Sequence, residues 1–208
     1  MTPTRDEQSE AASAFFSCGE PGPVVWITGL PGTGKTTIGR GLYTKLREAG
    51  EACVYLDGDS IREACGHDLG YTPEDRLANA LRICRMCQML SLQGLTVVCA
   101  TVSLYQQCHR WSREHHARYV EVLVTASAQV LRERDQKGLY SRAEREASVQ
   151  VPGLDQPFDY PEAPDLVLHN DRGDLGRAID SILTLLHRDP EARPGRPAAP
   201  ASDSPAFT

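Results

Sequence analysis

The clearest chemical pattern in the sequence is a glycine-rich segment that ends in a lysine and a threonine. Residues 29–36 read Gly-Leu-Pro-Gly-Thr-Gly-Lys-Thr and match the phosphate-loop pattern G-x-x-x-x-G-K-[ST] in full. Glycines let successive backbone N–H groups point inward around phosphate oxygens, and a helix that begins there adds the positive end of its dipole. Lys35 is expected to reach the β- and γ-phosphates of a nucleotide, and the Thr36 hydroxyl to ligate Mg²⁺.

This pattern predicts ATP and Mg²⁺ as cofactors, with Lys35 also acting in catalysis. We assign ATP binding to Gly29, Leu30, Pro31, Gly32, Thr33, Gly34, Lys35, Thr36 and Thr37. A guanine-reading Asn-Lys-x-Asp motif is absent from the sequence, which favours a kinase over a GTPase.

A second pattern, Asp57-Gly58-Asp59, follows an apolar run. Ligands of open α/β sheets bind beyond the carboxyl ends of the strands, so Asp57 and Asp59 are expected to face the phosphate loop. One carboxylate could orient or deprotonate an acceptor hydroxyl, and the other, Asp57, could hold Mg²⁺ through water. The alternative is an Asx-type turn that caps the short segment beginning at Ser60.

Arg62 and Arg76 follow within 20 residues of this pattern. The fixed fork of a guanidinium suits a doubly anionic acceptor, such as a phosphate or sulfate ester. Each arginine taken alone is more typical of a solvated surface position, and only the presence of Asp59 and the phosphate loop beside them makes a role in binding the acceptor anion an equal alternative.

Composition excludes several classes of protein. The formal net charge of −6 over 208 residues argues against a dedicated nucleic-acid binder. No apolar run approaches the roughly 20 residues that cross a bilayer, and the N-terminus lacks a signal-peptide core. We therefore expect no nucleic-acid or membrane partner, and a homodimer remains open.

The seven cysteines are an odd number and cannot all pair with one another, which favours a reduced, cytoplasmic protein. Cys84 and Cys87 have redox or zinc spacing, but they lie inside a helical pattern, where packing on one helix face is the favoured interpretation.

The elements that must position these residues alternate along the chain. Short apolar runs predict strands at 24–28, 53–57, 95–100, 119–124 and 165–168. Helical patterns occupy 35–49, 73–93, 105–118, 128–135 and 174–187. The alternation predicts an α/β fold, a three-layer, doubly wound sandwich of the P-loop NTPase type with a five-stranded, mainly parallel sheet.

The two ends differ in composition from the body of the chain. Residues 1–20 are acidic and polar, and residues 189–208 contain five of the 14 prolines and little to bury. We expect a disordered N-terminal extension over 1–20, a kinase domain over 21–188 and a disordered Pro/Ala-rich tail over 189–208.

Further motifs follow along the chain. They are Trp26-Ile27-Thr28-Gly29-Leu30, Leu56-Asp57-Gly58-Asp59, Asp68-Leu69-Gly70-Tyr71, Asp75-Arg76 with Asn79, Arg134-Asp135-Gln136-Lys137-Gly138-Leu139-Tyr140, Gly153-Leu154-Asp155 and Pro161-Glu162-Ala163-Pro164-Asp165-Leu166-Val167-Leu168. Through this series, residues 22–171 resemble the adenylyl-sulfate kinase family, which uses ATP to phosphorylate the ribose 3′-hydroxyl of adenosine 5′-phosphosulfate in sulfate assimilation.

The resemblance implies roles for individual residues. Asp59 would act on the acceptor hydroxyl, Arg134 would lie against the ATP adenine, and Lys137 would belong to a mobile lid that excludes water. The acceptor nucleotide would be held by Asp57, Asp59, Arg62, Tyr71, Arg76, Asn79, Ser103, Lys137 and Val151, with Tyr71 stacking on its base.

The chain departs from the family pattern near the expected acceptor site. Ser103-Leu104-Tyr105-Gln106 stands where the family has Ser-Pro-Tyr-Arg, so a positive charge is lost at Gln106; we assign Ser103 no covalent role. Val151 stands where the family has a phenylalanine that forms one side of an aromatic sandwich around adenine. Stacking of a base on an aromatic ring contributes roughly 1–3 kcal/mol, so valine weakens the binding of an adenine nucleotide.

Two acceptors therefore stay open. The nominal acceptor is adenosine 5′-phosphosulfate, with the alternative of another nucleotide such as cytidine diphosphoramidate, which one branch of a similar subgroup phosphorylates. A different class of function is a non-catalytic nucleotide-binding regulator that has lost its acceptor.

Three further side chains carry weaker expectations. Trp26 lies in an apolar strand and is expected in the core, whereas His115 and His116 lie in a polar helix and are expected to be exposed. His169 ends the last strand, where it could approach the ATP adenine or cap the strand.

Overall fold

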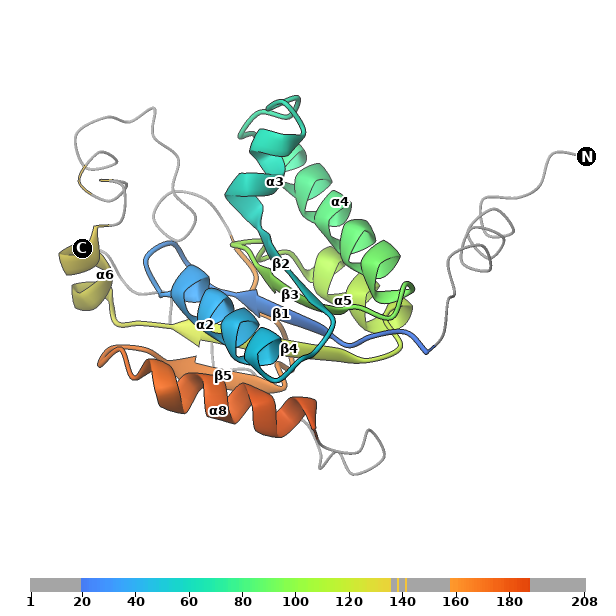
Figure 1. Ribbon diagram of the computed structural model, residues 1–208. Coiled ribbons are helices and arrows are strands. Elements are labelled where there is room, and N and C mark those ends of the chain that lie inside the picture. The colour runs from blue at the N-terminus through green and yellow to red at the C-terminus, as the bar shows by residue number, and fades with distance from the viewer. Residues whose placement is uncertain (1–19, 136–137, 139–140, 142–157, 188–208) are drawn as a thin grey trace, which may run out of the picture.

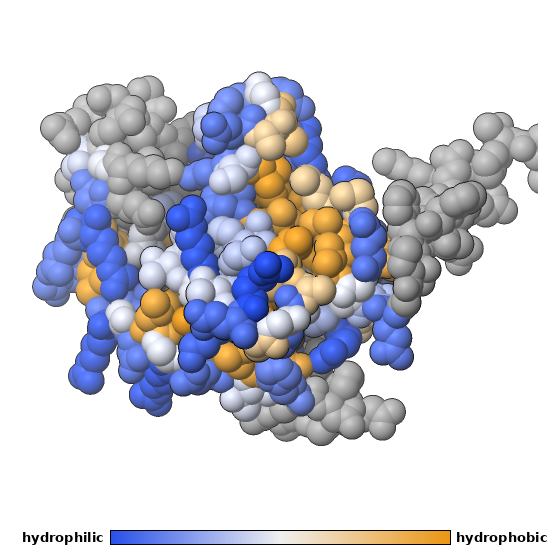
Figure 2. All heavy atoms as spheres, viewed as in Figure 1, coloured by the Kyte–Doolittle hydropathy of each residue, from blue (hydrophilic) through white to orange (hydrophobic). Residues whose placement is uncertain are grey.

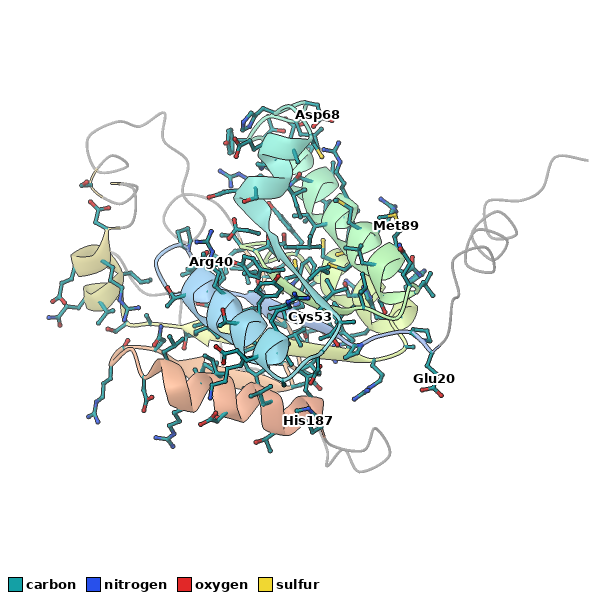
Figure 3. All side chains as sticks on the ribbon, viewed as in Figure 1. Glu20, Arg40, Cys53, Asp68, Met89 and His187 are labelled. Atoms are coloured by element: carbon teal, nitrogen blue, oxygen red, sulfur yellow. The ribbon has the colours of Figure 1, made fainter. Side chains whose placement is uncertain are left out.

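The computed structural model describes residues 20–135, 138, 141 and 158–187. Of the expected extension over 1–20 only Glu20 is described, and the expected tail over 189–208 lies outside the described residues, as do Lys137 and Val151. Glu20 and His187, labelled in Figure 3, are the first and last residues of the described part.

The centre of the molecule is a five-stranded sheet in the order β2-β3-β1-β4-β5, in which all four neighbouring pairs are parallel. Its strands are β1 (Val24–Thr28), β2 (Cys53–Asp57), β3 (Thr96–Ala100), β4 (Tyr119–Thr125) and β5 (Leu166–His169). The five predicted strands are confirmed, with ends that move by one residue, and the sheet is entirely parallel.

Helices cover both faces of this sheet, as Figure 1 shows. They are α2 (Lys35–Glu48), α3 (Gly58–Ala64), α4 (Pro73–Ser91), α5 (Gln106–His115), α6 (Ala128–Arg134) and α8 (Leu175–Leu186). The five predicted helices are present. The short helix α3 was not predicted, because its residues carry no apolar periodicity; it is held by its cap instead.

Alternate side chains of each strand point to opposite faces, and each face has its own core cluster. On one face Ile38 and Leu42 of α2 and Ile179 and Ile182 of α8 pack against alternate residues of the central strands. On the other face Ile83 of α4 packs with residues such as Trp26, which is fully buried as expected. The predicted three-layer arrangement is thus confirmed.

Local capping explains where α4 begins and ends. The Thr72 hydroxyl accepts a hydrogen bond from the Asp75 N–H over 3.2 Å, and Pro73 fills the first turn. At the other end Gly94 has a φ of 81°, the left-handed conformation that lets the chain turn back into β3.

The cysteines of α4 pack as a helix face. Cys84 and Cys87 are fully buried in the same cluster as Cys99 and Cys108, and all six cysteines in the described part of the chain are free thiols.

None of the helices in these described ranges is long and apolar enough to span a membrane. Figure 2 shows hydrophobic residues gathered over α4, where Met89 is exposed.

The expectation for one of the two adjacent histidines His115 and His116 is wrong. His115 is exposed, but His116 is buried, because it lies just after the last turn of α5 and its Nδ1 is 2.8 Å from the carbonyl oxygen of Ser112. Its ring packs against Trp111 and Tyr119. Burial lowers the pKa of His116.

Candidate active site

The phosphate loop joins the central strand β1 to helix α2, so it stands at the carboxyl edge of the sheet. Gly32 and Gly34 have φ angles of 81° and 99°, a region that other residues rarely adopt. Gly34 is the N-cap of α2, and its carbonyl oxygen accepts the first helical hydrogen bond from Ile38 over 3.0 Å. The helix N-terminus therefore points at the centre of the loop, as a phosphate site requires.

Lys35 is buried at the first position of α2, and its Nζ donates to the carbonyl oxygen of Leu30 over 2.8 Å. Burial lowers the pKa of Lys35 to about 8, against the opposing effect of the carboxylates of Asp57 and Asp59. The charge of Lys35 in the loop therefore interacts with the charges of both carboxylates. A bound polyphosphate would stabilise the charged form of this buried ammonium and raise its pKa again.

Asp57 links the end of β2 to the phosphate loop. Its Oδ2 accepts hydrogen bonds from Thr36 Oγ1 over 3.2 Å and from the Tyr55 hydroxyl over 3.1 Å. Its Oδ1 accepts from the N–H of Asp59 over 3.0 Å, which makes Asp57 the N-cap of α3. The two alternatives of the sequence analysis are therefore compatible: the aspartate caps a short helix and also faces the loop.

Asp59 lies in the first turn of α3, and its side chain is exposed. The same helix carries Arg62 one turn later. The Asp59 carboxylate and Arg62, which the sequence analysis expects at the acceptor, thus come from one helix whose N-cap is Asp57.

Arg62, Tyr71 and Arg76 form a cluster beside α3. Arg62 Nη1 donates to the carbonyl oxygens of Leu69 and Gly70 over 3.0 and 2.9 Å, and Arg76 Nε donates to the Tyr71 carbonyl oxygen over 2.9 Å. The two guanidinium carbons lie 4.8 and 5.2 Å from the centre of the Tyr71 ring, which is 59% exposed. The cluster offers positive charge and an exposed aromatic ring to an anionic, ring-bearing molecule.

Asn79 lies one turn after Arg76 on α4 and is buried. Its Oδ1 has no hydrogen-bond partner among the described residues. Burial raises the pKa of the Tyr105 hydroxyl, and the charges of Arg76 and Arg62 oppose that rise.

Ser103 is buried after β3, and its Oγ lies 2.8 Å from the Oγ1 of Thr101. Thr101 lies against Gly58, where a β-carbon would come within 3.0 Å of its Oγ1. Ser103 is therefore close to the start of α3. Gln106, at the departure from the family pattern, donates from Nε2 to the Tyr160 carbonyl oxygen over 2.7 Å.

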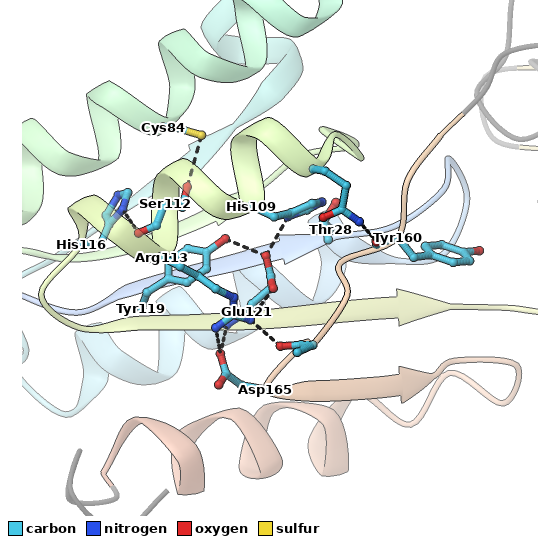
Figure 4. Close-up of polar contacts among 12 residues, drawn as sticks. Thr28, Cys84, His109, Ser112, Arg113, His116, Tyr119, Glu121, Tyr160 and Asp165 are labelled. Atoms are coloured by element: carbon cyan, nitrogen blue, oxygen red, sulfur yellow. Dashed lines mark hydrogen bonds and ion pairs between the residues drawn. The ribbon is translucent and has the colours of Figure 1, made fainter. Parts of the chain in front are cut away.

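A buried cluster of charged side chains joins α5 to β4, as Figure 4 shows. Glu121 is fully buried, and its carboxylate contacts His109 Nδ1 over 2.7 Å, the Tyr119 hydroxyl over 3.0 Å and Arg113. Arg113 also donates to the Ala163 carbonyl oxygen over 2.6 Å. The cluster fastens the segment before β5 to α5.

Two residues hold the phosphate loop from the β5 side. Asn170 Nδ2 donates to the Thr33 carbonyl oxygen over 2.7 Å. Arg134, predicted beside the ATP adenine, donates to the carbonyl oxygens of Gly32 and Asn170 over 3.2 and 2.7 Å. His169 Nδ1 lies 2.9 Å from Thr125 Oγ1, a contact between the ends of β4 and β5.

Sequence reasoning missed Asn170, Tyr55 and Tyr105. Asn170 follows the last strand and Tyr55 precedes the Asp57 motif, and neither belongs to a chemical pattern of its own. Their position at strand ends was the available signal, because such positions face the ligand edge of a parallel sheet. Lys137 and Val151, expected at the acceptor, lie outside the described residues.

The donor set beside the loop fits a hard divalent cation. Thr36 and Asp57 provide a hydroxyl and a carboxylate in contact with each other. Mg²⁺ typically takes one or two protein oxygens and completes its shell with phosphate and water. Within the described residues no group of three or more acidic, histidine or cysteine side chains could hold a metal by itself.

Comparisons with known proteins agree with this geometry. The sequence profile of the adenylylsulphate kinase family matches residues 21–169. A protein of Paraburkholderia xenovorans named adenylyl-sulfate kinase is 41% identical over 166 residues, which cover 79% of this chain and 93% of that protein. The cytidine diphosphoramidate kinase of Campylobacter jejuni is 38% identical over 164 residues, which cover 78% of this chain and 95% of that one.

Among solved structures, the APS kinase of Mycobacterium tuberculosis in complex with AMPPNP and APS superposes with a TM-score of 0.76 at 31% identity. The match covers 82% of this chain and all of that one (100%).

Proposed function

Since the chain belongs to the adenylylsulphate kinase family and is a kinase that phosphorylates a hydroxyl group, we propose that it transfers the γ-phosphoryl group of ATP to the ribose 3′-hydroxyl of a small anionic nucleotide. The nominal acceptor is adenosine 5′-phosphosulfate, which gives 3′-phosphoadenosine 5′-phosphosulfate. With this acceptor the enzyme would act in sulfate assimilation in the cytoplasm. The observation that carries the proposal is the phosphate loop, whose Lys35 and Thr36 share one site with Asp57 and Asp59.

ATP occupies the loop in this proposal. Backbone N–H groups around Gly32 and Gly34 bind its phosphates, and Lys35 leaves the Leu30 carbonyl to pair with the β- and γ-phosphates. Arg134 borders the adenine, since it already spans Gly32 and Asn170 at the mouth of the loop.

Thr36 and Asp57 would hold Mg²⁺, Thr36 by its hydroxyl and Asp57 through water. The cation would supply charge neutralisation for the phosphates of ATP. Their mutual hydrogen bond is compatible with that role, because a threonine hydroxyl that donates to Asp57 keeps its lone pairs for a cation.

Asp59 orients the acceptor hydroxyl and takes its proton as the hydroxyl oxygen bonds to the γ-phosphorus and the bond from that phosphorus to ADP breaks. Its exposed position in the first turn of α3 supports this assignment. Positioning and neutralisation of charge supply most of the rate enhancement.

Arg62 and Arg76 bind the anionic group of the acceptor, and Tyr71 stacks on its base. Asn79 offers its Oδ1 to a donor on the acceptor. Ser103, Lys137 and Val151 complete the proposed acceptor set, the last two from outside the described residues.

A second acceptor, cytidine diphosphoramidate, is favoured by one specific observation. Gln106 stands where the family has an arginine, and its amide is engaged with Tyr160 rather than offered as a cation to an acceptor. The relative from Campylobacter jejuni that carries this activity in its name is nearly as similar as the adenylyl-sulfate kinases.

A coupled assay of ADP release over a panel of acceptors tests the proposal. The panel contains adenosine 5′-phosphosulfate, cytidine diphosphoramidate, the corresponding mononucleotides and a blank without acceptor. We expect release that depends on adenosine 5′-phosphosulfate, and a phosphate on the 3′-position of the product by NMR. A higher kcat/KM with cytidine diphosphoramidate would move the assignment to the second acceptor. ATP binding without turnover on any member would support the non-catalytic regulator instead.

A further inference from the structure

The carboxylate of Asp57 is held at three points by its neighbours. Thr36 and Tyr55 donate to Oδ2, and the N–H of Asp59 donates to Oδ1. Tyr55 and Asp57 are two residues apart on β2, so both side chains lie on the same face of the sheet, toward α2. The hydroxyl of Tyr55 therefore shares one acceptor atom with the hydroxyl of Thr36.

The packing of α2 makes room for the Tyr55 ring. Gly39 lies one turn after Thr36, and a β-carbon at Gly39 would come within 2.8 Å of Tyr55 Cε2. The guanidinium carbon of Arg40, labelled on α2 in Figure 3, lies 6.0 Å from the ring centre. The Tyr43 ring centre is 6.2 Å away. Because Gly39 has no side chain, the Tyr55 ring can pack against α2 at this position, where its hydroxyl reaches Asp57.

The hydroxyl of Tyr55 acts as a neutral donor. A tyrosine hydroxyl is uncharged at neutral pH, and it donates to Asp57 Oδ2 over 3.1 Å. It therefore stabilises the carboxylate without cancelling its charge. A lysine or arginine at this position would instead compete with a cation for Asp57.

We propose that Tyr55 is a positioning residue of the metal–nucleotide site, whose hydroxyl fixes the Asp57 carboxylate so that Thr36 turns its lone pairs toward the Mg²⁺ bound with ATP. The inference rests on the assignment of ATP and Mg²⁺ in the proposed function, and it is independent of which acceptor is used. With the Tyr55 hydroxyl removed, the carboxylate loses one of two donors to Oδ2 and rotates more freely away from Thr36.

The test is the affinity for ATP of the Tyr55→Phe variant, measured by titration calorimetry with excess Mg²⁺ and again with EDTA. We expect the affinity without metal to stay within about twofold of wild type. The gain in affinity that Mg²⁺ gives should fall by roughly five- to tenfold, the effect of losing one typical hydrogen bond. Tyr43→Phe, which removes a hydroxyl from the neighbouring ring of the same helix–sheet layer, is the matched control and should match wild type.

A double-mutant cycle with Asp57→Asn separates positioning from packing. If Tyr55 acts through Asp57, Tyr55→Phe should leave the residual Mg²⁺ effect of Asp57→Asn unchanged. Equal losses in both backgrounds, or equal losses with and without Mg²⁺, would overturn the inference in favour of a packing role. If Mg²⁺ raises the ATP affinity of Tyr55→Phe as much as that of wild type, only the role of Tyr55 is overturned. If Mg²⁺ does not raise the ATP affinity of wild type, the metal assignment is overturned as well.

Discussion

Asn170 and Thr33 are 137 positions apart in the sequence, yet the Asn170 side chain donates to the Thr33 carbonyl oxygen over 2.7 Å. The contact turns that carbonyl away from the interior of the phosphate loop, where N–H groups must point inward to bind phosphate. It also explains the glycine that follows, because a β-carbon at Gly34 would lie 2.4 Å from Asn170 Nδ2. The end of β5 therefore shapes the loop that follows β1.

Asn170→Ala should weaken ATP binding by about tenfold, since the Thr33 carbonyl loses its partner and the loop gains alternative conformations. Asn170→Asp should weaken it further, because a carboxylate would face both a carbonyl oxygen and the phosphates. Equilibrium binding of ATP measures both effects. Asp171→Asn is the control on the same turn, since the Asp171 carboxylate accepts from the Ser127 N–H instead. ATP affinity unchanged in Asn170→Ala would show that the loop keeps its shape alone.

Asp59→Asn should lower kcat for phosphoryl transfer by at least about 100-fold, as expected on loss of a general base. ATP affinity should stay within about twofold, because the proposed role of Asp59 is on the acceptor hydroxyl and not on ATP. Steady-state assays together with ATP titrations separate the two quantities. Glu63→Gln, a matched change on the exposed face of the same helix, should leave both unchanged. Turnover retained in Asp59→Asn would remove Asp59 from the mechanism.

ATP binding should take up a proton in mildly alkaline solution. Burial lowers the pKa of Lys35 in the free enzyme to about 8, and bound phosphates should raise it again because their charge favours the ammonium form. Between the two values, binding protonates the lysine, so ATP affinity should fall by about tenfold per pH unit above about pH 8.

Titration calorimetry at about pH 8.5 in buffers of different ionisation enthalpy measures this uptake directly. We expect most of one proton near that pH, almost none near pH 6.5, and none at either pH in Lys35→Met. Heats that do not depend on the buffer at the higher pH would mean that Lys35 is already fully protonated in the free enzyme.

Tyr71→Ala should raise the KM for the nucleotide acceptor by about tenfold or more, from the loss of one base-stacking surface, while the KM for ATP stays constant. Tyr71→Phe keeps the ring beside Arg62 and Arg76 and should behave like wild type. Initial rates over both substrates provide the comparison. An equal effect of both variants would point to the hydroxyl rather than to stacking.

Glu121→Gln should destabilise the domain by about 3–5 kcal/mol at neutral pH, because it leaves the largely buried guanidinium of Arg113 without its carboxylate. Burial raises the pKa of Glu121, but hydrogen bonds and charges from His109 and Arg113 outweigh it and leave the pKa lowered. The stabilisation is therefore complete above the ordinary glutamate pKa and is lost as the pH falls through the lowered value.

Urea denaturation of wild type and Glu121→Gln at several pH values tests this expectation. The difference in unfolding free energy should shrink toward acid pH. Glu114→Gln, an exposed position on α5, should change the free energy by less than about 0.5 kcal/mol. A difference that does not vary with pH would rule out the charge of Glu121 as its cause.

Local sequence was sufficient for much of the fold. The strands and the long helices follow from apolar periodicity, and the phosphate loop follows from fixed spacing over residues 29–36. Helix α3 was missed because its first turn depends on the Asp57 cap rather than on periodicity. His116 was assigned to the surface because its neighbours in sequence are polar, whereas Trp111 and Tyr119 cover it in space.

The sequence by itself determined the chemical groups of the candidate site: a phosphate loop, paired aspartates and arginines with an aromatic ring, each a pattern within a few residues. Only the tertiary structure decided how these groups are held. Asn170 donates to the Thr33 carbonyl oxygen of the loop, Tyr55 donates to Asp57, and Arg113, paired with Glu121, ties the segment before β5 to α5. The physical reason is that a parallel sheet brings together strand ends from distant parts of the chain, and periodicity within one segment carries no information on which ends meet.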